Sequence, residues 1–130
     1  MSENSLRGSI LVIDDEEAIR GVLRQLLEKH GYEVRTAGGG KDGLAAARQY
    51  EPDLIILDIM MDDMDGTEVG GTLRDAPRTA GIPIIYLTGL MSAEEGARRV
   101  GDSGDVVVAK PFDAHDLFRH VRHLLGDGST

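Results

Sequence analysis

Cysteine and tryptophan are both absent from this chain of 130 residues. Without cysteine there is no disulfide framework and no thiolate for a metal or redox site, which is typical of a reducing compartment. No apolar run approaches the ~20 residues that span a bilayer, and residues 1–8 lack the apolar stretch of a secretory signal. We therefore expect a cytoplasmic chain that makes no membrane contact.

Basic residues are also scarce: 14 Lys and Arg face 23 Asp and Glu, a formal net charge of −9 at pH 7. An acidic surface repels phosphate backbones, so we expect no direct nucleic-acid binding. The length fits one domain, which at this size buries roughly two-thirds of the surface of its unfolded chain. We expect that domain over residues 9–125, with short tails at 1–8 and 126–130.

Short apolar runs alternate with amphipathic segments along the chain. The apolar runs predict strands at residues 9–13, 32–36, 54–57, 83–87 and 106–108. Helical spacing and caps predict helices between them: one that ends at Gly31, and others at 41–50, 67–75, 92–100 and 114–125. This alternation predicts an α/β fold of the (βα)5 type, a parallel sheet with helices on both faces.

Two of the predicted helices carry finer signals. Helical spacing predicts one inner face in the first helix, made of Ile19, Val22, Leu23, Leu26 and Leu27. The fourth helix begins at a capping box, Ser92 with Glu95 three residues later. Its Gly96 lowers the helix propensity, so we expect a soft helix there.

Polar side chains stand at the ends of four of the five predicted strands. They are Asp14 and Asp15 after the first strand, Asp58 after the third, Thr88 after the fourth and Lys110 after the fifth. Ligands of an open parallel sheet bind beyond the carboxyl ends of its strands. We therefore expect these side chains to share one pocket.

Three carboxylates in one pocket repel each other. A like-charged pair at ~4 Å costs about 1 kcal/mol in water and about 4 kcal/mol at an effective dielectric constant of 20. Lys110 or a hard divalent cation must offset this cost. Mg²⁺ prefers oxygen ligands, and no His or Cys stands at ligand spacing for zinc.

A carboxylate beside Mg²⁺ and a lysine favours phosphoryl transfer, in which catalysis is mainly positioning and charge compensation. Asp58 is the best nucleophile for an aspartyl phosphate, because it ends the most apolar strand. Asp14 and Asp15 are better placed to hold the metal. Thr88 offers one hydroxyl donor to a phosphoryl oxygen, and Lys110 offers a positive charge.

Four motifs together resemble the response-regulator receiver domain of two-component signalling, over about residues 8–125. They are Ile-Leu-Val-Ile-Asp-Asp-Glu at 10–16, Leu-Asp-Ile-Met-Met-Asp-Asp-Met-Asp-Gly at 57–66, Thr-Gly at 88–89 and Lys-Pro-Phe at 110–112. The resemblance implies a flavodoxin-like sheet in the order 2-1-3-4-5. It also implies Mg²⁺ held by Asp15, Asp58 and the backbone carbonyl of Met60, with Asp14 assisting.

The same resemblance implies function and partners. A sensor histidine kinase or histidine phosphotransfer protein would transfer its phosphoryl group to Asp58, where Thr88 and Lys110 would bind it. The domain would then switch a downstream effector protein, as a monomer or a weak phosphorylation-dependent dimer. It would have no enzymatic activity beyond self-phosphorylation from a phosphodonor and slow autodephosphorylation.

The chain departs from the family pattern at three positions. Asp62 replaces a frequent proline, Gly89 a usual alanine, and Val107 the usual tyrosine or phenylalanine of the switch. A β-branched valine has few rotamers and cannot swing as that ring does. We expect the switch to run instead from Thr88 through 89–92 to the face built from 92–100, 106–109 and 114–125. Tyr86 is either a replacement ring or a core tyrosine.

Three other functions fit the sequence less well. A haloacid-dehalogenase-like phosphatase normally needs an Asp at position 60, where this chain has Met60. A pseudo-receiver, which is not phosphorylated, has no need of the intact acidic pocket. A flavodoxin needs a Ser/Thr-rich phosphate loop after the first strand, where Asp14 and Asp15 would repel the flavin phosphate. The three glycines at 38–40 also lack the Lys-Ser/Thr ending of a P-loop.

Overall fold

The computed structural model describes residues 8–89, 92–100 and 105–126. Most of the two predicted tails, and residues 90–91 of the predicted switch route, lie outside these ranges. Strands and helices alternate along the described chain. In order they are β1 (Ser9–Ile13), α1 (Glu17–Lys29), β2 (Glu33–Ala37), α2 (Gly40–Tyr50), β3 (Leu54–Asp58), α3 (Gly66–Asp75), β4 (Ile84–Thr88), α4 (Ala93–Val100), β5 (Val106–Ala109) and α5 (Ala114–Leu125).

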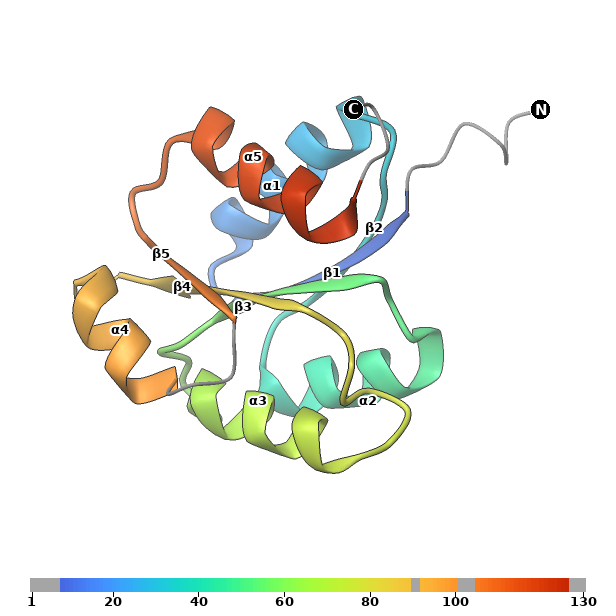
Figure 1. The fold of residues 1–130 in the computed structure, drawn as a ribbon, viewed down its shortest axis with the longest axis vertical. Helices are drawn as coiled ribbons and strands as arrows, with labels where there is room; N and C mark the ends of the chain where they lie inside the picture. The colour runs from blue at the N-terminus through green and yellow to red at the C-terminus, as the bar shows by residue number, and fades with distance from the viewer. Residues whose placement is uncertain (1–7, 90–91, 101–104, 127–130) are drawn as a thin grey trace.

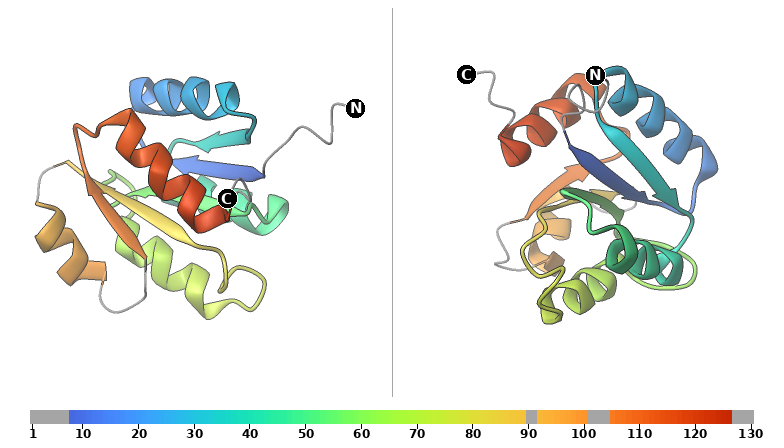
Figure 2. Two further views of the ribbon diagram at one scale, coloured as in Figure 1. Left: turned by 45° about the horizontal axis from the view of Figure 1, so that its top comes forward. Right: turned by 90° about the vertical axis from the view of Figure 1, so that its right-hand side faces the viewer.

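The strands form one parallel sheet in the order β2-β1-β3-β4-β5. This confirms the predicted (βα)5 flavodoxin-like fold. Helices α1 and α5 cover one face of the sheet, and α2, α3 and α4 cover the other (Figures 1 and 2). None of the helices in the described ranges has both the length and the apolar character that a bilayer span requires.

Alternate residues of each central strand face opposite layers of the core. In β1, Ile10 and Val12 pack in the layer under α1 and α5, whereas Leu11 and Ile13 pack in the layer over α2 and α3. Every residue of β3 is buried, as expected for a parallel strand covered on both faces. Full burial of one such aliphatic side chain stabilises the fold by about 1.5–3 kcal/mol, so the central strands are held firmly.

The inner face predicted for the first helix is wrong at one position, Val22. Leu23 and Leu27 of α1 are fully buried, but Val22 is 53% exposed. Successive residues of a helix are rotated by about 100°, so the neighbour of Leu23 faces outward when Leu23 points straight at the sheet.

The capping box predicted at the start of the fourth helix is confirmed, because Glu95 N donates to Ser92 Oγ at 3.1 Å and Ser92 N donates to Glu95 Oε1 at 3.4 Å.

The connection from β3 to α3 is closed by a glycine. Gly66 N donates to Ile59 O at 2.6 Å. A Cβ at Gly66 would overlap the carbonyl oxygen of Asp58 and lie 2.7 Å from Ile59 Cα. Only a residue without a side chain therefore lets the start of α3 approach the end of β3 so closely.

We predict that Gly66→Ala lowers the free energy of unfolding by about 2–4 kcal/mol, because the new methyl group displaces backbone atoms. The matched control is Gly71→Ala in the same helix, where an added Cβ has nothing within 4 Å. That control should be neutral or slightly stabilising. Urea unfolding measures both, and equal stability of the two variants would contradict the prediction.

Candidate functional site

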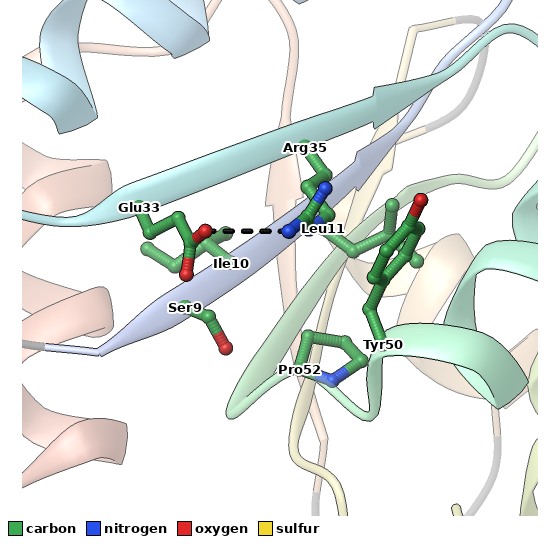
Figure 3. A pocket seen from close by; sticks show the side chains of 7 residues that line it. All are labelled: Ser9, Ile10, Leu11, Glu33, Arg35, Tyr50 and Pro52. Atoms are coloured by element: carbon green, nitrogen blue, oxygen red, sulfur yellow. Dashed lines mark hydrogen bonds and ion pairs between the residues drawn. The ribbon is translucent and has the colours of Figure 1, made fainter.

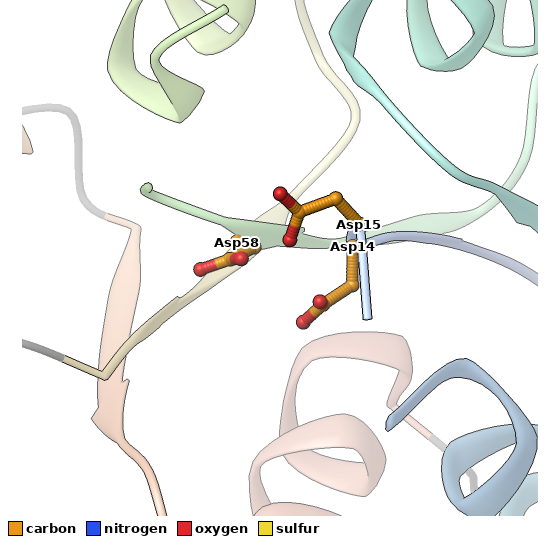
Figure 4. A group of neighbouring side chains, drawn as sticks. All are labelled: Asp14, Asp15 and Asp58. Carbon is orange, nitrogen blue, oxygen red and sulfur yellow. The ribbon is translucent and has the colours of Figure 1, made fainter. Parts of the chain in front are cut away.

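The acidic residues predicted from the strand ends lie together at one edge of the sheet. Asp14 and Asp15 follow β1, and Asp58 is the last residue of β3, the strand paired with β1. One carboxylate oxygen from each lies within 4.8 Å of the other two. Figure 4 shows these three side chains gathered beyond the strands.

The cluster is buried but reachable. Asp14 has no exposed surface and Asp58 is 3% exposed. A cleft of about 510 Å³ opens over Asp58 and is also lined by Asp15, Met60 and Lys110. A ligand that enters this cleft therefore meets the Asp58 carboxylate, while Asp14 stays behind it.

Lys110 supplies the positive charge of the pocket. Its Nζ lies 2.9 Å from Asp14 Oδ2, 3.0 Å from Glu16 Oε1 and 3.6 Å from Asp58 Oδ2. Burial lowers the pKa of Lys110, but the bonds to Asp14 and Glu16 and the negative charges of Asp14 and Asp58 outweigh it. The pKa of Lys110 therefore lies above its ordinary value, and the ammonium stays protonated.

Thr88, at the end of β4, is fully buried, and its carbonyl accepts a hydrogen bond from Lys110 N at 2.7 Å. The bond ties the end of β4 to the residue that follows β5. The third partner of the lysine, Glu16, had no role in the sequence-based prediction. Its only signal there is its position directly after Asp14 and Asp15.

Burial and, after it, the charge of Asp14 raise the pKa of Asp58 from its ordinary value of 3.8 to about 6. The positive charge of Lys110 and a hydrogen bond from Met60 N to Asp58 Oδ1 at 3.3 Å act in the opposite direction. The pocket therefore holds more negative charge than its one lysine compensates. A further cation close to Asp58 would therefore stabilise its ionised form.

The residues present fit a hard divalent cation. Asp14 Oδ2 is buried, and its partner in the described part of the chain is the ammonium of Lys110, whose Nζ lies 2.9 Å away. Asp14, Asp15 and Asp58 offer carboxylate oxygens, the ligands that Mg²⁺ prefers. Met60 lines the same cleft and is 42% exposed. The metal-binding role of its carbonyl stays a prediction.

The residues behind the pocket are tightly packed. Val107 is half-buried in β5, and a Cβ at Gly96 of α4 would lie 2.8 Å from Val107 Cγ1 and 3.5 Å from Thr88 Cγ2. Gly96, expected only to soften its helix, thus lets α4 approach β5 and the end of β4. The role of Val107 in switching stays a prediction.

Tyr86 is packed as a core residue. It is 4% exposed, and its hydroxyl occupies the space that a Cβ at Gly70 of α3 would need. Burial and, after it, the charge of Asp105, which is paired with Arg74 at 2.5 Å, raise the pKa of Tyr86 to about 12. A ring fixed between β4 and α3 in this way is not free to swing.

A second, smaller hollow lies at the opposite end of β1, at Ser9 (Figure 3). Arg35 in this hollow pairs with Glu33 at 3.3 Å and stacks on the Tyr50 ring at 3.7 Å. The guanidinium is therefore already engaged on two sides. The hollow does not have the gathered carboxylates of the cleft at Asp58.

Known proteins share both the sequence and the fold. Residues 10–122 match the model of the response regulator receiver domain. The DNA-binding dual master transcriptional regulator RpaA of Synechocystis sp. is 40% identical over 116 residues, which cover 89% of this chain and 48% of that protein. The chain spans about half the length of the curated relatives that it matches.

Solved structures agree. A putative response regulator from Chloroflexus aurantiacus superposes with a TM-score of 0.84 at 28% identity, covering 92% of this chain and 98% of that one. Chemotaxis response regulator CheY4 of Vibrio cholerae gives a TM-score of 0.81 at 29% identity, covering 89% and 97%. The chain therefore belongs to the response regulator receiver domain family of two-component signalling.

Proposed function

We propose that this receiver domain accepts a phosphoryl group on Asp58 from the phosphohistidine of a sensor histidine kinase or histidine phosphotransfer protein. One observation carries the proposal: the carboxylate that opens into the cleft has both a lysine ammonium at 3.6 Å and the carboxylates of Asp14 and Asp15 beside it. A nucleophile, a positive charge and the ligands for a divalent cation therefore meet at one place.

In the proposed reaction an oxygen of Asp58 attacks the phosphorus of the phosphohistidine. The new O–P bond forms an acyl phosphate, and the P–N bond breaks as the imidazole leaves and takes up a proton. Mg²⁺ held by Asp14, Asp15, Asp58 and the Met60 carbonyl would neutralise phosphoryl oxygens. Lys110 would exchange part of its contact with Asp14 and Glu16 for the phosphoryl group, and the Thr88 hydroxyl would donate to it.

We predict that radiolabelled acetyl phosphate with Mg²⁺ labels the wild-type chain and does not label Asp58→Asn, because an amide cannot form the acyl phosphate. Asp62→Asn is the matched control, since it removes one charge from the adjacent loop and leaves the nucleophile in place. EDTA should abolish labelling of both wild type and control. Equal labelling of Asp58→Asn, or none of wild type, would contradict the proposal.

The pKa of about 6 for Asp58 also predicts how stability depends on pH. The ordinary value is 3.8, so the folded state binds this proton more tightly than the unfolded state does. The contribution of the protonated carboxyl is therefore present at low pH and is lost as the pH rises from about 4 to about 6. Above that range the folded metal-free protein carries the full cost of an ionised Asp58.

We predict that metal-free Asp58→Asn is more stable than metal-free wild type by about 2 kcal/mol near pH 7.5, and that this advantage shrinks by about 1 kcal/mol near pH 5. Urea unfolding in EDTA at both pH values measures it. Mg²⁺ should stabilise wild type at pH 7.5 and narrow the gap. An advantage that grows toward low pH would show that the sign is wrong.

We also propose that phosphorylation is reported to a protein effector through the face formed by α4, β5 and α5. Gly96 supports this route, because it brings α4 against both Thr88 and Val107. A shift of the Thr88 side chain toward a phosphoryl group would leave space beside α4. Only contacts that differ between the two states can drive such a shift.

Beryllofluoride, which mimics an aspartyl phosphate, should then change the amide NMR shifts of Thr88, Gly89, Gly96, Val107 and Lys110. The amides of β2, the strand at the opposite edge of the sheet from β5, serve as the internal reference and should change little. Shifts confined to Asp58 and the residues next to it in the sequence would rule out this route.

A further inference from the structure

The loop between β3 and α3, residues 59–65, helps to shape the metal site. Met60 N donates to Asp58 Oδ1 at 3.3 Å, and Asp62 N donates to Asp15 Oδ2 at 3.2 Å. Two backbone groups of the loop therefore orient two of the three clustered carboxylates. Whatever fixes the loop also fixes these ligands.

The loop is attached to α2 by the side chain of Asp63. Its Oδ1 accepts a hydrogen bond from Gly40 N at 2.9 Å, and its Oδ2 accepts one from Lys41 N at 3.1 Å. The residue that precedes α2, Gly39, offers no side-chain cap, so the free N–H groups of this helix end are capped from another segment. These two bonds hold the pKa of Asp63 below its usual range.

The glycines at the start of α2 make room for this contact. A Cβ at Gly39 would lie 3.0 Å from both carboxylate oxygens of Asp63, and a Cβ at Gly40 would lie 2.7 Å from Met64 Cβ. Gly39 has an extended backbone with φ −172°, a conformation open to any residue, so it is needed for space. Gly39 and Gly40, which do not belong to a P-loop, therefore leave the space in which the β3–α3 loop packs against the start of α2.

Asp62 and Asp63 are adjacent exposed acids with different hydrogen bonds. Asp62 contributes its backbone N–H to Asp15, whereas the side chain of Asp63 accepts two backbone N–H groups of α2. The side chain of Asp63 therefore joins the middle of the loop to α2 through hydrogen bonds, next to the packing of Met64 against Gly40.

We propose that Asp63 is a positioning residue of the divalent-cation site: it holds the β3–α3 loop on the start of α2, so that Met60 and Asp62 keep Asp58 and Asp15 in a metal-binding arrangement. The inference rests on the proposed function, because it takes Mg²⁺ binding at this cluster as given. Asp63 itself does not touch the ion.

Calorimetric titration with MgCl₂ tests the proposal on the full chain. Asp63→Ala should weaken Mg²⁺ binding about tenfold, in the range seen when groups that orient metal ligands are removed. Asp62→Ala removes the same charge from the same loop but keeps its backbone N–H, and should weaken binding less than about threefold. Asp63→Asn keeps one acceptor oxygen and should recover most of the affinity lost in Asp63→Ala.

A double-mutant cycle tests the contact from its other side. Gly39→Ala should weaken Mg²⁺ binding because its methyl group pushes on the Asp63 carboxylate. Adding Gly39→Ala to Asp63→Ala should have little further effect. Amide hydrogen exchange should show faster exchange at Gly40 and Lys41 in Asp63→Ala and not in Asp62→Ala.

The possible results distinguish a failure of the Asp63 inference from a failure of the proposed function. If wild type binds Mg²⁺ and Asp63→Ala binds it equally well, the inference is wrong and the proposed function stands, even if the variant is less stable. Equal losses in Asp62→Ala and Asp63→Ala would mean that charge alone matters, and would also overturn the inference. A wild type that binds no Mg²⁺ overturns both.

Discussion

Repulsion between carboxylates at a buried sheet edge is the constraint on which the site depends. β1 and β3 are paired in parallel, so the acids that end them must be neighbours, and two of them are almost fully buried. One lysine cannot neutralise this cluster. The paired central strands keep this acidic pocket assembled, and in the proposed function a metal ion and a phosphoryl group would relieve the repulsion within it.

The polar groups around the pocket share a second property: they are held by backbone contacts from distant segments. Lys110 is tied to β4 through the Thr88 carbonyl, and the loop after Asp58 is tied to α2 through Asp63. Glycines stand at the closest approaches, at Gly66 beside Asp58 and at Gly96 beside Val107. A chemical change at Asp58 therefore acts on side chains that are packed against rigid strands on one side and against closely fitted loops and helices on the other.

The fold and the acidic cluster were predictable because both follow from local patterns. Apolar runs and helical spacing predicted the strand and helix ends to within about one residue, apart from the end of the first helix, which was predicted at Gly31 and lies at Lys29. The alternation predicted the parallel sheet. What escaped prediction depends on distances across the fold. The partnership of Glu16 with Lys110 and the space requirements of Gly39 and Gly96 have no periodic signal. Val22 was misassigned because spacing alone cannot locate the centre of a helix contact.

The most direct test of the central claim is chemical identification of the phosphorylated residue. Borohydride reduces an aspartyl phosphate to homoserine, and unmodified carboxylates do not react. After phosphorylation with Mg²⁺, reduction and peptide mass spectrometry, the account predicts homoserine at position 58, with Asp14 and Asp15 unchanged. Homoserine at another acidic residue, or none in a chain that carries the label, would contradict it.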